Sequence, residues 1–77
     1  MITNAEKKLL DWDSGRAGSF FSSLFECMSH ADASNLARLG EGFPEEVEVF
    51  KKYRYQTGYF NELSAKYKSL ISGGGNG

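Results

Sequence analysis

The segment from Lys51 to Phe60 carries the residue types best suited to binding chemistry. Its ten positions hold three cations and four aromatic residues, namely Lys51, Lys52, Arg54, Tyr53, Tyr55, Tyr59 and Phe60. Lysine and arginine pair with phosphates, and aromatic faces stack on bases. The same combination suits a protein-protein hot spot. The alternative is an ordinary helix end, with Tyr53 and Phe60 in the core and the cations in solvent.

A bound anionic nucleotide would use the cations for its phosphates and the tyrosines for its base. The expected ligand-binding residues are Lys51, Lys52, Arg54, Tyr55 and Tyr59, and Arg38 and Arg16 are the secondary candidates. Arg16 stands in the glycine-rich stretch Gly15–Ser19 at a predicted helix start, where backbone N–H groups attract anions. That stretch lacks the P-loop pattern and follows no strand, so a flexible helix start is the alternative.

Metal and catalytic chemistry have weaker signals. Cys27 and His30 have the spacing of half a zinc site, but the chain has only one cysteine and one histidine, so a second copy would have to complete it. Glu26, His30 and Glu62 lack the repeated Glu-x-x-His of a carboxylate metal centre. The segment Ser29–Asp32 contains the triad residue types too close together to face one another. We therefore expect a protein that is not an enzyme and has no metal or cofactor.

The spacing of apolar residues predicts the elements that must position these side chains. It is helical throughout, and no long alternating stretch predicts a strand. We expect an all-α fold, a small bundle of about four to five short helices in one domain over residues 1–72. The predicted helices are about Asn4–Trp12, about Gly15–His30, a short one from Asp32 to Gly40, one from Pro44 to a break at Thr57-Gly58, and about Tyr59–Ile71. The glycine-rich tail, residues 73–77, is expected to be disordered.

Local capping signals predict the ends of these helices. Thr3 and Glu6 have the capping-box spacing. Asp13 or Ser14 is expected to cap the second helix. Gly40 suits the left-handed position that ends a helix.

The second predicted helix has the clearest amphipathic pattern, with an aromatic stripe on one face. Apolar spacing in the other helices is similar. The residues expected to be largely buried are Phe20, Phe21, Leu24, Phe25, Phe50, Leu63 and Tyr67. In the first helix, Ile2, Ala5, Leu9 and Trp12 fall on one side.

Chain length favours self-association. With 77 residues, the burial available to one chain barely offsets the conformational entropy lost on folding. Eleven aromatic residues are more than one small core needs. We therefore expect a homo-oligomer, a dimer or larger, with apolar residues of the second or last helix at the contact.

Charge and cysteine content restrict the partners and the compartment. The net charge of −1 argues against a nucleic-acid polymer. No apolar run is long enough to span a membrane, and the N-terminus has no signal-peptide pattern, so we expect no membrane partner. A single cysteine fits a reducing compartment, and we expect a cytoplasmic protein.

The middle of the chain resembles small helical accessory proteins of phages and prophages. The similarity covers Phe20 to Leu63 and is carried by Ala31-Asp32, Asn35–Leu39, Gly42–Val47 and Gly58–Phe60. It implies an inhibitor of host defence that acts in the host cytoplasm. The leading expectation is a phage-encoded protein that sequesters a small anionic nucleotide signal at subunit interfaces. The alternatives are an inhibitor or adaptor that binds a host enzyme through the aromatic-basic segment, and a structural or regulatory phage component.

Overall fold

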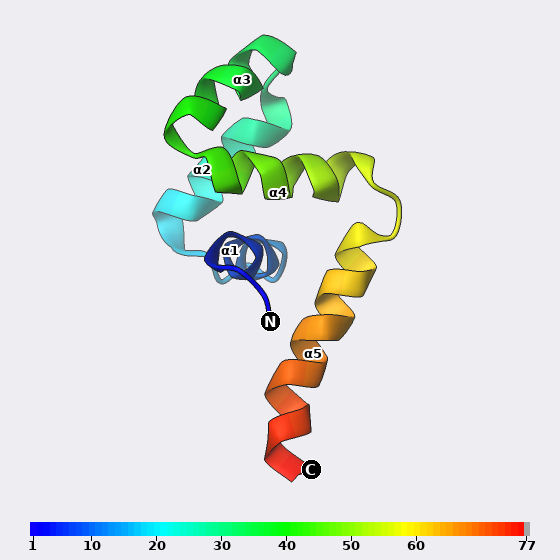
Figure 1. Ribbon diagram of the computed structural model, residues 1–77. Coiled ribbons are helices and arrows are strands. Elements are labelled where there is room, and N and C mark those ends of the chain that lie inside the picture. The colour runs from blue at the N-terminus through cyan, green and yellow to red at the C-terminus, as the bar shows by residue number, and fades with distance from the viewer. Residues whose placement is uncertain (77) are drawn as a thin grey trace.

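The computed structural model describes residues 1–76, and side chains for residues 1–72 (Figure 1). The described residues form five helices and no strand, which confirms the all-α prediction. The helices are α1 (Asn4–Asp13), α2 (Gly18–His30), α3 (Ala33–Gly42), α4 (Pro44–Tyr55) and α5 (Tyr59–Asn76). Helix α5 thus runs past Ile71. The tail predicted to be disordered, 73–77, lies where the structure describes no side chains, and Gly77 lies outside the described residues. None of these helices is both long and apolar enough to cross a membrane.

Local sequence sets the starts of α1, α3 and α4, and the capping box of α1 is the one predicted. The Thr3 hydroxyl accepts from the Glu6 N–H at 3.1 Å, and the Glu6 carboxylate accepts from the Thr3 N–H at 2.9 Å, which completes the capping box of α1. The Asp32 carboxylate caps α3 by accepting from the Asn35 N–H at 2.8 Å. Pro44 stands in the first turn of α4, where its missing N–H costs no hydrogen bond.

The start of α2 differs from the prediction. The helix begins at Gly18 and not at Gly15, and its N-cap, Ala17, makes no side-chain hydrogen bond. Gly15 and Gly18 have φ angles of +80° and +81°, a left-handed backbone that favours glycine and interrupts the helix. The predicted cap by Asp13 or Ser14 is wrong because both residues complete the end of α1.

The end of α3 also differs, since Gly40 lies inside the helix rather than after it. A Cβ at Gly40 would stand 3.7 Å from Cγ1 of Val47, so this glycine marks a close approach of α3 to α4. Helix α3 continues to Gly42 and stops before Phe43. Phe43, with φ of −132° and ψ of 63°, lies outside the helical region, which the following Pro44 disfavours for its backbone.

Helix α4 is the centre of the packing. It contacts each of the other four helices, and Figure 1 shows it crossing the molecule between α3 and α1, with α2 passing behind its start. Together the helices bury one apolar cluster. Its members are Ala5, Leu9, Leu24, Phe25, Met28, Leu36, Val47, Val49, Phe50 and Leu63.

The predicted core is confirmed for most of its members. Leu24, Phe25, Phe50 and Leu63 are buried. Phe21 and Tyr67 are half-buried. The prediction for Phe20 is wrong, because 58% of it is exposed. Its ring lies near two other aromatic rings, those of Phe21 and Phe43, with centroids 5.1 and 5.9 Å away.

Trp12 joins the helices through aromatic contacts. Its ring stacks on Phe25 of α2 with centroids 5.3 Å apart and planes inclined by 19°. It also meets Phe50 and Tyr53 of α4, at 6.3 and 5.8 Å. Tyr53 in turn meets Phe60 of α5 edge-on at 5.4 Å. Tyr53 and Phe60 of the aromatic-basic segment therefore pack against the core.

Candidate functional site

The last turn of α4 presents a surface that we call the basic-aromatic end, formed by Lys51, Lys52, Arg54 and Tyr55. Helical spacing puts Lys51, Lys52 and Tyr55 on one side of α4, since positions three and four apart share a face. These three side chains, with Glu48 and Gln56, line an open hollow of about 250 Å³. The predicted cluster is thus partly assembled by a single helix.

Arg54 lies on a different side of α4 from Lys52, next to the ring of Tyr55. The Arg54 guanidinium carbon is 5.8 Å from the centroids of both the Phe50 and the Tyr55 rings, within the range of cation–π attraction. Phe50 is buried, whereas 69% of Tyr55 is exposed. An exposed aromatic ring therefore stands at the end of a packed helix, with cations on both sides.

Tyr59 is held by contacts to two other residues of the chain. Its hydroxyl donates to Oε2 of Glu6 at 2.9 Å, and its ring lies 5.8 Å from the ammonium of Lys52. Oε1 of the same Glu6 caps α1. Glu6 thus ties the start of α5 to the start of α1, and Tyr59 is a structural joint rather than a free stacking face.

This joint shifts the pKa of both partners. Burial raises the pKa of Glu6, but hydrogen bonds from the Thr3 backbone and the Tyr59 hydroxyl lower it. The charges of Lys66 and Lys52 lower it further, and its pKa ends below the ordinary 4.5. Burial and the hydrogen bond to Glu6 raise the pKa of Tyr59 well above 10.0. The folded state therefore favours an ionised Glu6 and a neutral Tyr59.

The joint predicts a loss of stability at both ends of the pH scale. Because the pKa of Glu6 is lowered by folding, its stabilisation is present above pH 4.5 and is lost as the pH falls through the folded pKa. Because the pKa of Tyr59 is raised, its stabilisation is present below pH 10.0 and is lost as the pH rises. Tyr59→Phe should cost about 1 kcal/mol at neutral pH.

Urea unfolding at a series of pH values measures this effect. Glu6→Gln keeps a side chain that can cap α1 but cannot ionise, so its stability should fall less in acid than that of the wild type. Tyr59→Phe should remove part of the alkaline loss. Parallel pH profiles for the wild type and both variants would contradict the role of the joint.

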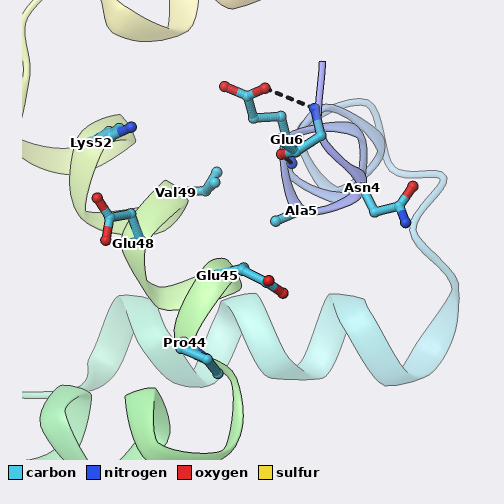
Figure 2. Close-up of a pocket in the computed structure, with 9 residues that line it drawn as sticks. Asn4, Ala5, Glu6, Pro44, Glu45, Glu48, Val49 and Lys52 are labelled. Carbon is cyan, nitrogen blue, oxygen red and sulfur yellow. Dashed lines mark hydrogen bonds between the residues drawn. The ribbon is translucent and has the colours of Figure 1, made fainter. Parts of the chain in front are cut away.

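The largest hollow near the basic-aromatic end is acidic. It measures about 440 Å³ and lies between the start of α1 and α4. Glu6, Glu45 and Glu48 supply three carboxylates to its lining, against one ammonium, that of Lys52. Figure 2 shows Lys52 and Glu6 extending toward the space between the two helices. The excess of negative charge makes this hollow unsuitable for an anionic nucleotide.

The two secondary candidates lie apart from the basic-aromatic end. Arg38 lines a hollow of about 450 Å³ with Cys27 and His30. Arg16, in the connection between α1 and α2, lines a different hollow between α1 and α5. The structure therefore divides the seven predicted ligand-binding residues among separate surfaces.

The two residues considered as metal ligands, Cys27 and His30, lie on the exposed surface. Cys27 is an exposed free thiol. His30 Nε2 is 3.5 Å from Oε2 of Glu26, and both side chains are mostly exposed. Within residues 1–76, no group of three or more His, Cys, Asp or Glu side chains is placed to hold a metal ion.

Sequence reasoning found Glu6 only as a helix cap and missed its contact with Tyr59. The two residues stand 53 positions apart, so no local pattern signals their pairing. Comparison of the chain with protein-family models, with curated proteins and with solved structures finds no match.

Proposed function

We propose that this is a non-enzymatic binding protein that contacts another protein through the basic-aromatic end of α4. The observation that supports this is Tyr55, a ring that is 69% exposed and lies beside the Arg54 guanidinium. Tyrosine and arginine are the residues that most often carry the energy of protein-protein contacts. The adjoining Lys51 and Lys52 favour a partner with an acidic surface.

The geometry favours this function over sequestration of a nucleotide within one chain. Pockets for small ligands usually measure about 300–1,000 Å³ and enclose most of the ligand. The hollow beside Tyr55 is smaller, at about 250 Å³, and Glu48 brings a carboxylate into it. Tyr59 is engaged by Glu6, and Arg16 and Arg38 lie elsewhere. An acidic protein surface needs no enclosure, and it can meet Tyr55 and the cations together.

The partner class that fits the resemblance is a host enzyme. An inhibitor of this kind would cover an acidic surface of the enzyme with Tyr55 at the centre and the cations around it. The phage origin and the nucleotide-sequestering alternative stay predictions, and the experiment below separates the two binding modes.

Truncating Tyr55 or Arg54 should weaken partner binding without unfolding the protein. Loss of a hot-spot side chain costs about 2 kcal/mol or more, which corresponds to roughly 30-fold in Kd. Immobilised wild type, Tyr55→Ala and Arg54→Ala are exposed to bacterial lysate, and retained proteins are quantified. The matched controls are Phe20→Ala, another exposed aromatic ring, and Arg38→Ala, another exposed arginine.

Proteins retained by the wild type and both controls, but lost with both test variants, would support the proposal once direct titration reproduces the difference. Retention that is equal for all five chains would contradict it. A nucleotide that raises the melting temperature of the wild type but not of Tyr55→Ala would also contradict it, in favour of nucleotide binding.

A further inference from the structure

A hollow of about 290 Å³ lies between α1 and α5, and we call it the α1–α5 hollow. Most of its lining residues recur every three or four positions along each helix, so one side of α1 faces one side of α5 across the space. Helix α5 packs mainly on α4. Figure 1 shows the second half of α5 running away from the other four helices. The two facing sides therefore enclose a space that neither helix fills.

Apolar and aromatic side chains form much of the wall of the α1–α5 hollow. Leu10 contributes from α1, and Phe60, Tyr67 and Ile71 contribute from α5. Phe60 packs on the core, Leu10 and Tyr67 are half-buried, and Ile71 is 61% exposed. An apolar group bound here would remove this surface from water. Pockets for small ligands usually have walls of this kind, with a few polar groups that fix the orientation of the ligand.

Lys7 and Asp11 neutralise one another in this wall. Nζ of Lys7 donates to both carboxylate oxygens of Asp11, at 2.8 and 3.0 Å, and lies 5.6 Å from the centroid of the Tyr67 ring. The hydrogen bond to Asp11 raises the pKa of Lys7 above its ordinary value, and the positive charge of Arg16 opposes this rise. The ion pair is therefore a fixed part of the wall, and Arg16 brings a further positive charge near it.

The end of α1 holds Arg16 at the hollow. Gly15 has a φ angle of +80°, and the N–H groups of Gly15 and Arg16 donate to the carbonyls of Trp12 and Asp11, at 3.1 and 2.7 Å. This pair of hydrogen bonds is the Schellman motif, which fixes the backbone just after a helix. The sequence suggested Arg16 as an anion-binding residue at the start of α2, whereas the structure places it beside the facing sides of α1 and α5.

Positive charge exceeds negative charge around the hollow. Its charged lining residues are three cations, Lys7, Arg16 and Lys68, and two acids, Asp11 and Asp13. Once Lys7 is paired with Asp11, Arg16 and Lys68 remain against Asp13. Over residues 1–72, whose side chains are described, none of these three makes an ion pair. An anion would therefore gain two charge-assisted partners and face one opposing carboxylate.

We propose that the α1–α5 hollow binds a small organic anion that carries an aromatic ring. The acid group, a carboxylate or a phosphate, pairs with Arg16 and Lys68. The ring lies against Tyr67 and Ile71, since aromatic rings attract one another beyond the effect of burial. The volume is close to the lower limit of about 300 Å³ for small-ligand pockets, so the hollow suits a single ring rather than a nucleotide.

NMR titration of the ¹⁵N-labelled full chain tests this site. The probes are phenyl phosphate and phenylacetate, which combine a ring with an acid group. Inorganic phosphate supplies the charge alone, and benzyl alcohol supplies the ring alone. The amide signals of residues 7–16 and 60–71 should shift with both probes. Phenyl phosphate should bind at least about tenfold more tightly than either comparison compound, because ring and charge contribute together.

Charge variants test the acid-group contact. Arg16→Gln should weaken phenyl phosphate binding by about tenfold, since a charge-assisted hydrogen bond is lost. Arg38→Gln is the matched control, because Arg38 is an exposed arginine at a different hollow, and it should bind as the wild type does. Asp13→Asn removes the opposing carboxylate and should strengthen binding by about twofold.

Apolar variants test the ring contact. Ile71→Ala should weaken phenyl phosphate binding by about threefold and leave the binding of inorganic phosphate unchanged. Leu70→Ala is the matched control, because Leu70 is a neighbouring exposed side chain that does not line the hollow, and it should change neither. Circular dichroism checks that both variants remain helical.

Three results would overturn the proposal. The first is that neither probe shifts these signals at concentrations up to about 10 mM, which covers millimolar affinities. The second is that the shifts centre on the basic-aromatic end of α4. The third is that Arg16→Gln binds phenyl phosphate as Arg38→Gln does, which would indicate attraction by net charge alone. The site is independent of the protein-binding proposal, so Tyr55→Ala should still bind phenyl phosphate, and failure of one proposal is distinguishable from failure of the other.

Discussion

Phe25→Ala should lower the free energy of unfolding by about 3–5 kcal/mol, because it removes a large ring from a packed site and leaves a cavity. Phe25 is 0% exposed and stacks on Trp12. A domain of this length is typically stable by only about 4–11 kcal/mol. The substitution should therefore remove much of the stability, and the variant should be partly unfolded near physiological temperature.

Phe20 supplies the matched control for this result. It stands on the same helix and was assigned to the same stripe, but 58% of it is exposed. Phe20→Ala should change the free energy of unfolding by about 1 kcal/mol or less, because few contacts are lost. Urea unfolding followed by the fluorescence of Trp12, the single tryptophan, measures both variants. Protein concentration must be the same throughout, since association would raise the apparent stability.

Equal losses for Phe25→Ala and Phe20→Ala would contradict the packing of α2. A wild-type midpoint for Phe25→Ala would show that α2 turns another face toward the core. Either result would also remove the basis for the central position of Trp12.

Trp12→Ala should cost about 3 kcal/mol, at the low end of the range for large aromatic residues because the ring is only half-buried. The loss is large for a half-buried residue because Trp12 meets rings on both α2 and α4, those of Phe25, Phe50 and Tyr53. Aromatic pairs in such geometries add about 0.5–1.5 kcal/mol beyond burial.

Trp12→Phe tests whether the ring contacts carry this effect. It keeps a ring that can stack on Phe25 and should recover more than half of the loss. Thermal unfolding followed by circular dichroism at 222 nm suits this series, because the variants lack the tryptophan. If Trp12→Ala and Trp12→Phe are equally destabilised, contacts specific to the indole, and not stacking, hold the helices together.

The sequence was sufficient where the interactions that form an element are local. The Thr3–Glu6 capping box, the Asp32 cap and the Pro44 start all involve residues within three positions of one another or the backbone preference of one residue. Helical spacing likewise grouped Lys51, Lys52 and Tyr55, because one helix face brings them together whatever the rest of the chain does. Even the break at Gly58, with φ of +87°, was marked by a residue that tolerates this backbone.

Tertiary packing decided what the same patterns leave open. Phe20 and Phe25 satisfy one apolar stripe equally well, but only Phe25 is fully buried, where it stacks on Trp12 of α1. Gly40 reads as a helix end until Val47 of the next helix is placed against it.

The candidate site likewise depends partly on local sequence and partly on tertiary packing. Tyr59 is an available aromatic ring in the sequence, and only the folded chain brings Glu6 from 53 positions away to hold its hydroxyl. Arg16, Arg38 and the basic-aromatic end are separated for the same reason, since residues on different helices meet only where the helices pack. A sequence records which faces are apolar or charged, whereas their partners follow from how the helices cross, which no spacing along the chain encodes.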